Sequence, residues 1–339
     1  MRALSALSQS ELVEWMTSVG QPAFRAKQVR DWLDRKWVQS FDEMRNVPNA
    51  CRARLEAEFL CGSVTPVEAR TADDGTTKFL LELADESQIE CVLIPSPGRN
   101  TVCISTQVGC PVRCAFCASG REGLVRNLTQ AEIVDQVRFA CHELGHRVDN
   151  LVVMGVGEPL LNLDALIPAL AAVCDPERIG LSARRVTVST SGIVPGIRRL
   201  AHAGHPWGLA VSLHAPRDRD RARLIPPEYR YPLREILNAC RAYETETNRM
   251  VTLEYALIAG QNDSLDHAKS LANIAKELHA KVNLIPLNPT GSNHAAPPHE
   301  VARAFQAVLV EGGVQATVRR EKGAAVAAAC GQLRAIHSA

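Results

Sequence analysis

The spacing of apolar positions divides the chain into a helical beginning and a longer part in which strands alternate with helices. In the first 65 residues, apolar side chains recur every three or four positions over residues 8–16, 22–36 and 50–59, without the alternation typical of a strand. We therefore expect residues 1–65 to form a small helical domain.

The next 33 positions predict a hairpin. Residues 65–74 are polar and irregular, so no regular element is expected there. Residues 78–84 and 89–95 alternate apolar with polar side chains around Asp85 and Glu86, which is typical of two paired strands. We interpret residues 66–98 as a β-hairpin connector.

From Thr101 onward, short β-rich runs alternate with longer helical ones, and we expect residues 99–339 to form the core. Thr129 and Glu132 have the spacing of a capping box before the first core helix. Strand-plus-helix units predict an α/β fold, either a parallel sheet or a partial barrel, with its active site at the carboxyl ends of the strands. The expected strands are 102–105, 150–154, 185–189, 208–212, 251–257 and 281–285, and the expected helices are 130–144, 163–173, 194–203, 232–243 and 264–278.

Composition narrows the class of protein. With 339 residues, 46% hydrophobic and 22% charged, the chain has the profile of an ordinary globular protein, which excludes a disordered or coiled-coil chain. No apolar stretch approaches eighteen residues, and residues 1–20 lack the apolar run of a secretion signal. The expectation is a cytoplasmic protein without a membrane partner.

Charge is balanced overall, with 38 basic and 37 acidic residues, but it is unevenly distributed. Residues 178–234 contain 11 arginines, no lysine and three acidic residues. Such a basic segment suits a phosphate-rich ligand, although an arginine-rich solvated surface has the same composition. Aromatic residues are only 4%, so few could serve as platforms for stacked bases.

Cysteines give the strongest chemical signal. There are 11, and four of them fall within residues 103–117. Cys110, Cys114 and Cys117 form a C-x3-C-x2-C triplet in the loop after the first core strand. Three thiolates can hold three irons of a 4Fe-4S cube and leave the fourth iron open to another molecule, which indicates chemistry rather than a structural role. Structural zinc requires four ligands, usually in C-x2-C pairs, and no second pair is present.

A second metal motif has a simpler interpretation. Residues 142–146 read HELGH and match the H-E-x-x-H pattern of zinc proteases on a helix. The predicted helix ends near Gly145, and no convincing third ligand follows. We interpret the motif as a polar helix terminus.

The cysteine triplet, with Phe116 before its last cysteine, resembles the hallmark of the radical S-adenosylmethionine (SAM) superfamily. From Phe24 to Leu333 the chain further resembles the RlmN/Cfr family of RNA adenine methyltransferases. This resemblance implies a partial (βα)6 radical SAM barrel with a small N-terminal helical domain. It also implies one 4Fe-4S cluster held by the triplet, whose open iron binds SAM for cleavage to a 5'-deoxyadenosyl radical. The similar stretches are 24–28 (FRAKQ), 74–79 (DGTTKF), 109–120, 126–129 (RNLT), 154–162 (MGVGEPLLN), 189–192 (STSG), 212–215 (SLHA), 283–289 (NLIPLNP) and 329–333 (ACGQL).

Carbons C2 and C8 of adenine are electron-poor and cannot attack SAM as an amine would, whereas a carbon radical can add to them. The resemblance implies that two SAM molecules are used per turnover. One methylates Cys330, and the radical from the second abstracts hydrogen from that S-methyl group, which then adds to the ring. Glu90 is implied to accept the ring proton. Cys103 is implied to release the product by forming a transient disulfide with Cys330.

The same resemblance assigns seven further positions to SAM. Gly157 and Glu158 follow the second core strand, where the backbone can approach the ligand and a carboxylate can bind the amino group of methionine. The other implied SAM contacts are Ser189, Ser212, Leu213, His214 and Asn288. One segment departs from the family pattern, because residues 323–327 before Cys330 read GAAVA where acids are common.

The implied partners are 23S rRNA, tRNA and an external electron donor such as a flavodoxin, and the chain is expected to act as a monomer. C2 methylation is preferred over C8 because C2 enzymes are the widespread members of the family. The residues leave open C8 methylation, a radical SAM enzyme acting on a non-RNA molecule, and a non-catalytic iron-sulfur protein that binds RNA. The resemblance implies that residues 1–65 are a helical accessory RNA-binding domain. Candidate phosphate contacts are the arginine-rich segment 178–234 and, in this domain, Arg25, Lys27, Arg30, Arg35 and Lys36.

Overall fold

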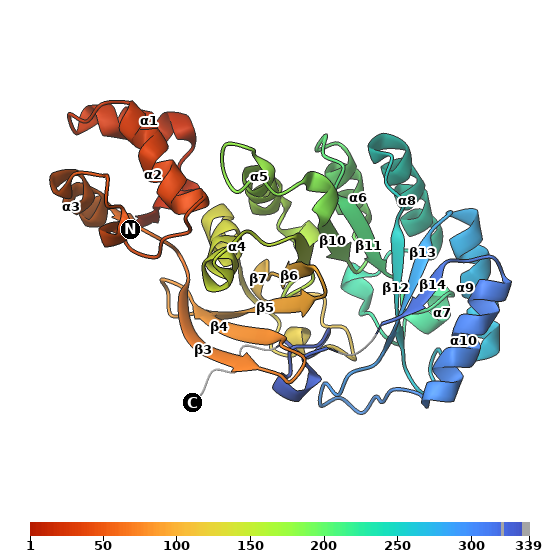
Figure 1. The fold of residues 1–339 in the computed structure, drawn as a ribbon. Coiled ribbons are helices and arrows are strands. Elements are labelled where there is room, and N and C mark those ends of the chain that lie inside the picture. Colours follow the sequence, from red (N-terminus) through yellow and green to blue (C-terminus); the bar gives the residue numbers. More distant parts are fainter. Residues whose placement is uncertain (320–321, 334–339) are drawn as a thin grey trace.

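The computed structural model describes residues 1–319 and 322–333 (Figure 1). Its centre is a mixed sheet in which the strand order is β14-β13-β12-β11-β10-β9-β6-β5-β4-β3. Neighbours from β6 to β14 are parallel, and neighbours from β3 to β6 are antiparallel. The α/β class is confirmed, and each predicted core strand is present. The strands are β3 (Thr65–Thr71), β4 (Thr77–Glu82), β5 (Gln88–Ser96), β6 (Arg99–Cys103), β9 (Asn150–Val153), β10 (Val186–Thr190), β11 (Gly208–Ser212), β12 (Thr252–Leu257), β13 (Lys281–Pro286) and β14 (Ala316–Val318).

Helices connect the parallel strands, as the alternating pattern predicts. Thr129 and Glu132 form the predicted capping box, and α4 ends as expected at Gly145, which has a left-handed φ of 68°. A final helix and strand, α10 and β14, extend the series beyond the predicted units. The helices are α4 (Gln130–Leu144), α5 (Leu163–Cys174), α6 (Val194–Ala201), α7 (Asp218–Arg221), α8 (Leu233–Thr247), α9 (Leu265–Glu277) and α10 (His299–Glu311).

The edge strand β3 corrects one prediction, because residues 65–71 form a strand where irregular chain was expected. All seven of its residues are exposed, so neither face selects apolar side chains and the sequence shows no alternation. Backbone pairing with β4 defines it instead. Through the β5–β6 pairing, the predicted hairpin is continuous with the core sheet.

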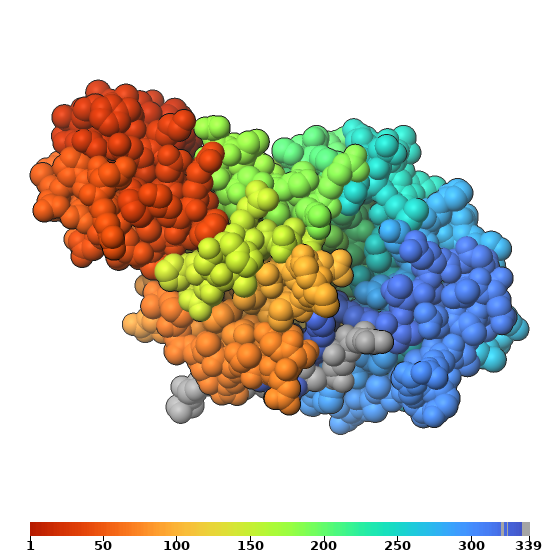
Figure 2. Space-filling view, viewed as in Figure 1, coloured from red at the N-terminus to blue at the C-terminus, as the bar shows by residue number. Residues whose placement is uncertain are grey.

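The first sixty residues fold into helices around their own apolar core and project from one end of the molecule (Figures 1 and 2). Leu12, Met16, Val29, Leu33 and Leu55 are completely buried in that core. The helices are α1 (Gln9–Ser18), α2 (Phe24–Asp34) and α3 (Asn49–Glu58), and the short strands β1 (Arg2–Ala3) and β2 (Phe59–Leu60) pair beside them.

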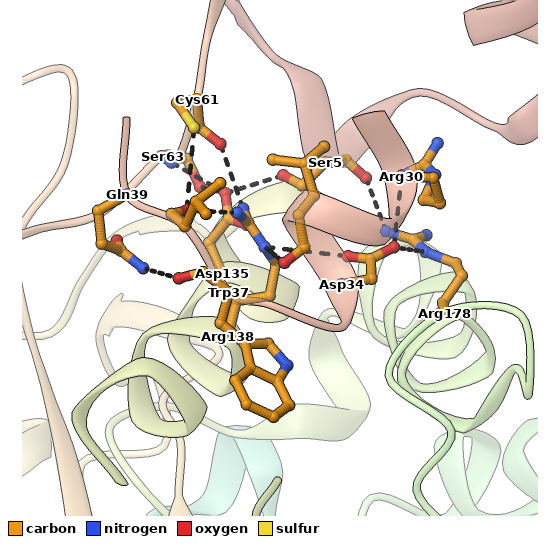
Figure 3. Close-up of polar contacts among 12 residues, drawn as sticks. Ser5, Arg30, Asp34, Trp37, Gln39, Cys61, Ser63, Asp135, Arg138 and Arg178 are labelled. Carbon is orange, nitrogen blue, oxygen red and sulfur yellow. Dashed lines mark hydrogen bonds and ion pairs between the residues drawn. The ribbon is translucent and has the colours of Figure 1, made fainter. Parts of the chain in front are cut away.

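A buried polar network joins these helices to α4 and to the loop after α5 (Figure 3). Asp34 forms ion pairs with Arg30, Arg138 and Arg178, the last at 2.7 Å. Arg138 also pairs with Asp135 at 2.6 Å and donates hydrogen bonds to the carbonyls of Leu33, Val38 and Cys61. Since such charges are satisfied only in one arrangement, the network specifies the docking geometry. Arg30 and Arg178 are thereby used inside the protein, which corrects their assignment as candidate phosphate contacts.

No helix within residues 1–319 and 322–333 is long and apolar enough to cross a membrane.

Candidate active site

Two adjoining cavities open at the carboxyl ends of the parallel strands, where an α/β sheet binds its ligands. The smaller, of about 170 Å³, brings together residues predicted from widely separated motifs. The predicted residues that line it are Cys110, Cys114, Cys117, Gly157, Glu158, Ser189, Ser212, His214, Asn288 and Cys330. Leu213 differs, because it is completely buried in the main apolar core and does not line this cavity.

The cysteine loop follows the short strand β7 (Gln107–Gly109), which pairs with β8 (Leu124–Asn127). Gly109 has a φ of +75°, and a Cβ atom there would lie 2.0 Å from the carbonyl oxygen of Gly123, so glycine is required at this turn. The backbone N–H of Cys110 donates to that carbonyl at 2.9 Å, and the N–H of Cys117 donates to the carbonyl of Cys114 at 3.1 Å. The loop is therefore shaped by its own backbone.

Burial raises the pKa of the Cys110 thiol to about 12, and it also raises the pKa values of Cys114 and Cys117. Iron must therefore displace a proton from each thiol when it binds. Within the described chain, no three His, Cys, Asp or Glu side chains are spaced to hold a single metal ion. A cube distributes its thiolates over different irons, so the three cysteines, which share one loop and one cavity wall, fit such a cluster better than a lone ion.

Glu158 lies 3% exposed at the base of the smaller cavity. One carboxylate oxygen accepts a hydrogen bond from the N–H of Ser191 at 2.7 Å, and the other accepts one from Leu160 at 3.1 Å. Burial raises the pKa of the carboxyl group, while the Ser191 hydrogen bond opposes that shift. Gly157 has a φ of +114° and no room for a Cβ atom, which would lie 2.8 Å from Gln107. Gly157 thus lets a ligand come close to the backbone, next to the fixed carboxylate of Glu158.

His214 is buried beside the cysteine loop, and its ring meets the edge of Phe116 at a centroid distance of 4.9 Å. Burial lowers the pKa of His214 to about 3, so the imidazole is neutral near pH 7. Its Nδ1 atom accepts a hydrogen bond from the N–H of Ala256 at 3.0 Å. The proton must therefore reside on Nε2, which makes His214 a hydrogen-bond donor toward the cavity it lines.

Cys330 is held in the smaller cavity by contacts from three directions. The side-chain amide of Asn288 donates to the Cys330 carbonyl at 2.9 Å, and Nη1 of Arg319 donates to its Sγ atom at 3.2 Å. Beside it, the N–H of Ala118 in the cysteine loop donates to the carbonyl of Gly331 at 2.8 Å. The tail is therefore tied to the cysteine loop and to two strand ends, despite its departure from the family pattern at residues 323–327.

The larger cavity, of about 820 Å³, shares Cys330 with the smaller one and is also lined by Cys103. Cys103 ends strand β6 and is 7% exposed. Burial raises its pKa to about 12, with a further contribution from Cys330. All 11 cysteines have free thiols in this structure. The cavity thus contains both sulfurs that the proposed exchange requires.

Glu90 lies on β5, outside the linings of both cavities, and is 2% exposed. Its carboxylate forms an ion pair with the ammonium of Lys78 at 2.8 Å. Val92 on β5 is paired with Cys103 on β6, and side chains two residues apart on a strand share a face. Glu90 and Cys103 therefore project from the same face of the sheet.

Sequence reasoning missed two charged residues at this site. Lys78 belongs to a stretch that carries the family resemblance, but no role was assigned to it. Arg319 lines both cavities and contacts Cys330, yet no motif marks it. A basic residue at the end of a strand was its only signal.

A sequence pattern described as the radical SAM superfamily matches residues 104–272, and one described as the ribosomal RNA large subunit methyltransferase N-terminal domain matches residues 3–60. A protein of Thermotoga neapolitana named as a probable dual-specificity RNA methyltransferase RlmN is 46% identical over 98% of both chains. The chain belongs to the RlmN family of radical SAM proteins. A relative of the same name from Symbiobacterium thermophilum is also 46% identical, over 98% of this chain and 91% of its own.

The crystal structure of a radical SAM methyltransferase from Sphaerobacter thermophilus superimposes with a TM-score of 0.95 at 44% identity, covering 98% of this chain and 99% of the other. Membership of the RlmN family implies a 4Fe-4S cluster and SAM as cofactors. The donor set of the smaller cavity, with three thiols on one wall and polar strand ends on the other, fits both groups.

Proposed function

We propose that the protein methylates C2 of an adenosine in 23S rRNA, and the adenosine 3' of the anticodon in some tRNAs, through an S-methylcysteine at Cys330. RNA as the substrate class is supported by the large-subunit rRNA methyltransferase pattern at residues 3–60. Two RNA classes are supported by the dual-specificity description of relatives that match the chain over nearly its whole length. The chain acts as a monomer in the cytoplasm.

One observation carries the proposal: Cys330 borders both cavities. A group carried on its sulfur can be loaded from one cavity and delivered into the other. The smaller cavity has the thiols and strand-end polar groups suited to a cluster and SAM, and the larger contains Cys103. A position between two cavities supports a carrier role for Cys330, whereas a thiol with only a structural role would not need access to both.

When bound, the cluster and SAM supply the 5'-deoxyadenosyl radical, using an electron from an external donor such as a flavodoxin. Cys110, Cys114 and Cys117 hold the irons. Glu158 orients the amino group of methionine, while the donor Nε2 of His214 and the side chains of Ser189, Ser212 and Asn288 line the rest of the binding site. Two SAM molecules serve each turnover, one as methyl donor to Cys330 and one as radical source.

Residues on the antiparallel part of the sheet complete the reaction. Glu90, oriented by Lys78, accepts the proton that leaves the adenine ring. Once the adduct has passed its unpaired electron to a one-electron acceptor, the Cys103 thiolate attacks the sulfur of Cys330 and a disulfide forms. The bond from that sulfur to the methylene carbon breaks, and its electron pair stays with the carbon, which takes up a proton to become the methyl group. Their shared face of the sheet supports this pairing of roles.

The larger cavity has the charge expected of an RNA entrance. Arg303, Arg319 and Lys322 line it, and no Asp or Glu does among the described residues. A phosphate backbone is attracted to such a surface. The adenosine must leave its stack to reach a sulfur at this depth, as in other enzymes that act on a base.

Mass spectrometry of digested rRNA and tRNA from cells with and without the gene tests the proposal. We expect 2-methyladenosine to disappear from both RNAs without the gene, to return with the wild-type gene and with Cys174→Ala, and to stay absent with Cys330→Ala. An 8-methyladenosine signal instead would assign C8 chemistry. No change in either nucleoside would reject RNA as the substrate and favour a radical SAM enzyme acting on another molecule.

A further inference from the structure

Arg319 follows strand β14 directly and is anchored by its backbone, whose N–H donates to the carbonyl of Leu284 on β13 at 2.8 Å. Its side chain extends to the sulfur of Cys330, with Nη1 3.2 Å from Sγ. The guanidinium therefore reaches the sulfur from a strand end, while Cys330 belongs to a tail in which the described residues 322–333 contain a single turn of 3-10 helix.

Only a few residues line both cavities, and Arg319 and Cys330 are among them. Asn288 also lines both cavities, and its side-chain amide nitrogen donates to the backbone carbonyl of Cys330 at 2.9 Å. The backbone and the sulfur of Cys330 are thus fixed by different residues, since Asn288 holds the carbonyl and Arg319 contacts Sγ.

The surroundings keep Arg319 charged. The negative charge of a Cys330 thiolate raises the pKa of Arg319, burial opposes that shift, and Glu254 on β12 adds to it. Glu254 is 6% exposed and accepts a hydrogen bond from the side-chain amide of Asn283 at 2.8 Å. A buried guanidinium held between a carboxyl group and a sulfur is a ready partner for a thiolate.

We propose that Arg319 is a positioning residue for Cys330 and holds its Sγ atom at the junction of the cavities until the sulfur, reacting as a thiolate, accepts a methyl group. This inference rests on the proposed carrier role of Cys330. In the transfer, a bond forms between Sγ and the methyl carbon, and the bond from that carbon to the sulfonium of SAM breaks. The bonding electron pair stays with the departing sulfur, which gives a neutral thioether and S-adenosylhomocysteine.

A neutral thioether is a weaker hydrogen-bond acceptor than a thiolate. Arg319 therefore holds the sulfur before methyl transfer and releases it afterwards. The methylated side chain is then free to turn toward the larger cavity, where the RNA base is expected.

The test uses the reconstituted full chain with its cluster, without RNA, in wild-type, Arg319→Lys and Arg319→Met forms. Arg241→Met is the matched control, because Arg241 lies on α8, forms an ion pair with Glu277 and lines neither cavity. Two rates are measured: methylation of the Cys330 peptide from SAM, followed by mass spectrometry, and alkylation of Cys330 by iodoacetamide without SAM. Iron content and melting temperature show that each variant is folded and loaded.

We expect Arg319→Met to slow both rates by roughly tenfold or more, Arg319→Lys to restore them in part, and Arg241→Met to leave them unchanged. Wild-type rates in Arg319→Met would overturn the inference. If Arg319→Met does not fold, Arg319→Lys decides, since wild-type values of both rates in this shorter, non-planar cation would also overturn it. If wild-type Cys330 takes up no methyl group, the proposed function fails, and the alkylation rates still decide the role of Arg319.

Discussion

The ammonium nitrogen of Lys78 lies 2.8 Å from the carboxylate of Glu90 and also donates to the carbonyl of Ala327, 3.3 Å away in the tail that ends at Cys330. Lys78 therefore connects the proposed proton acceptor with the segment that carries the proposed methyl carrier. The ion pair is largely buried, with side-chain exposures of 14% and 2%. A contact of this kind links the antiparallel strands to the tail.

Replacing Lys78 by methionine should impair RNA methylation more than methylation of Cys330. Loss of the ammonium leaves the Glu90 carboxylate buried without this partner, which costs about 3–5 kcal/mol of stability, and releases the tail at Ala327. The two half-reactions, measured separately by mass spectrometry, check this. Arg70→Met is the control, since Arg70 forms an exposed ion pair with Glu68 on neighbouring β3. Equal loss in both half-reactions would contradict a role for Lys78 specific to the RNA step.

Replacing Cys114 by alanine should abolish cluster binding, because two remaining thiols on the loop cannot hold three irons. Iron content and visible absorbance after anaerobic reconstitution check this, together with the formation of 5'-deoxyadenosine from SAM. Cys174→Ala is the matched control, since Cys174 is partly exposed at the end of α5 and lines neither cavity. Full iron content in Cys114→Ala would exclude this cysteine as a ligand.

Replacing Asp34 by asparagine should destabilise the docked helices by about 3–5 kcal/mol, because three buried arginines lose a shared anion. Lys27→Gln, which removes an exposed ion pair with Glu177 at the same junction, should cost no more than about 1 kcal/mol. Urea unfolding of the full chain, followed by tryptophan fluorescence and circular dichroism, measures both. Similar effects of the two substitutions would show that the network in Figure 3 adds nothing beyond surface charge.

His214 should make the protein less stable in acid. Its pKa is about 3 in the folded chain and 6.5 when unperturbed, so between these values the unfolded chain binds a proton that the folded chain does not. Stability from this group is therefore complete above pH 6.5 and falls as the pH drops toward 3, by about 3 kcal/mol at pH 4.

The measurement compares wild type with His214→Asn at pH 7 and pH 4. Between pH 7 and pH 4 the wild type should lose about 3 kcal/mol more unfolding free energy than the variant. His202→Asn serves as control, because the side chain of His202 is 69% exposed. A pH dependence that is unchanged in His214→Asn would show that the imidazole is not buried in its neutral form.

The elements that sequence analysis predicted well are those whose side chains face a core. Strands β9 to β13 and helices α4, α5, α6, α8 and α9 carry periodic apolar positions because one or both faces are buried, and the capping box at Thr129 marked the start of α4. Strand β3 escaped detection because none of its side chains is buried. Backbone pairing alone leaves little trace in a sequence.

In the site, the predictable residues are those whose signal lies within one short segment of the sequence. The cysteine loop was predictable because its three cysteines are close in sequence, and the strand-end residues were predicted through family motifs. Arg319 and Lys78 were not, because their roles arise from contacts with Cys330 and Glu90 that join distant segments. Arg30 and Arg178 likewise pair with Asp34 inside the protein because the N-terminal helices dock against the core, and residue type alone does not predict such docking.

The hairpin of β4 and β5 constrains how the gene for this protein can diverge. Glu90 faces the same side as Cys103 only while its strand keeps its present register, and successive side chains alternate between faces. Deleting or inserting a single codon between the turn at Asp85 and Glu90 would rotate the carboxylate to the opposite face. If Glu90 accepts the ring proton as proposed, single-residue changes of length between that turn and Glu90 should be removed by selection, even where each new side chain is tolerated.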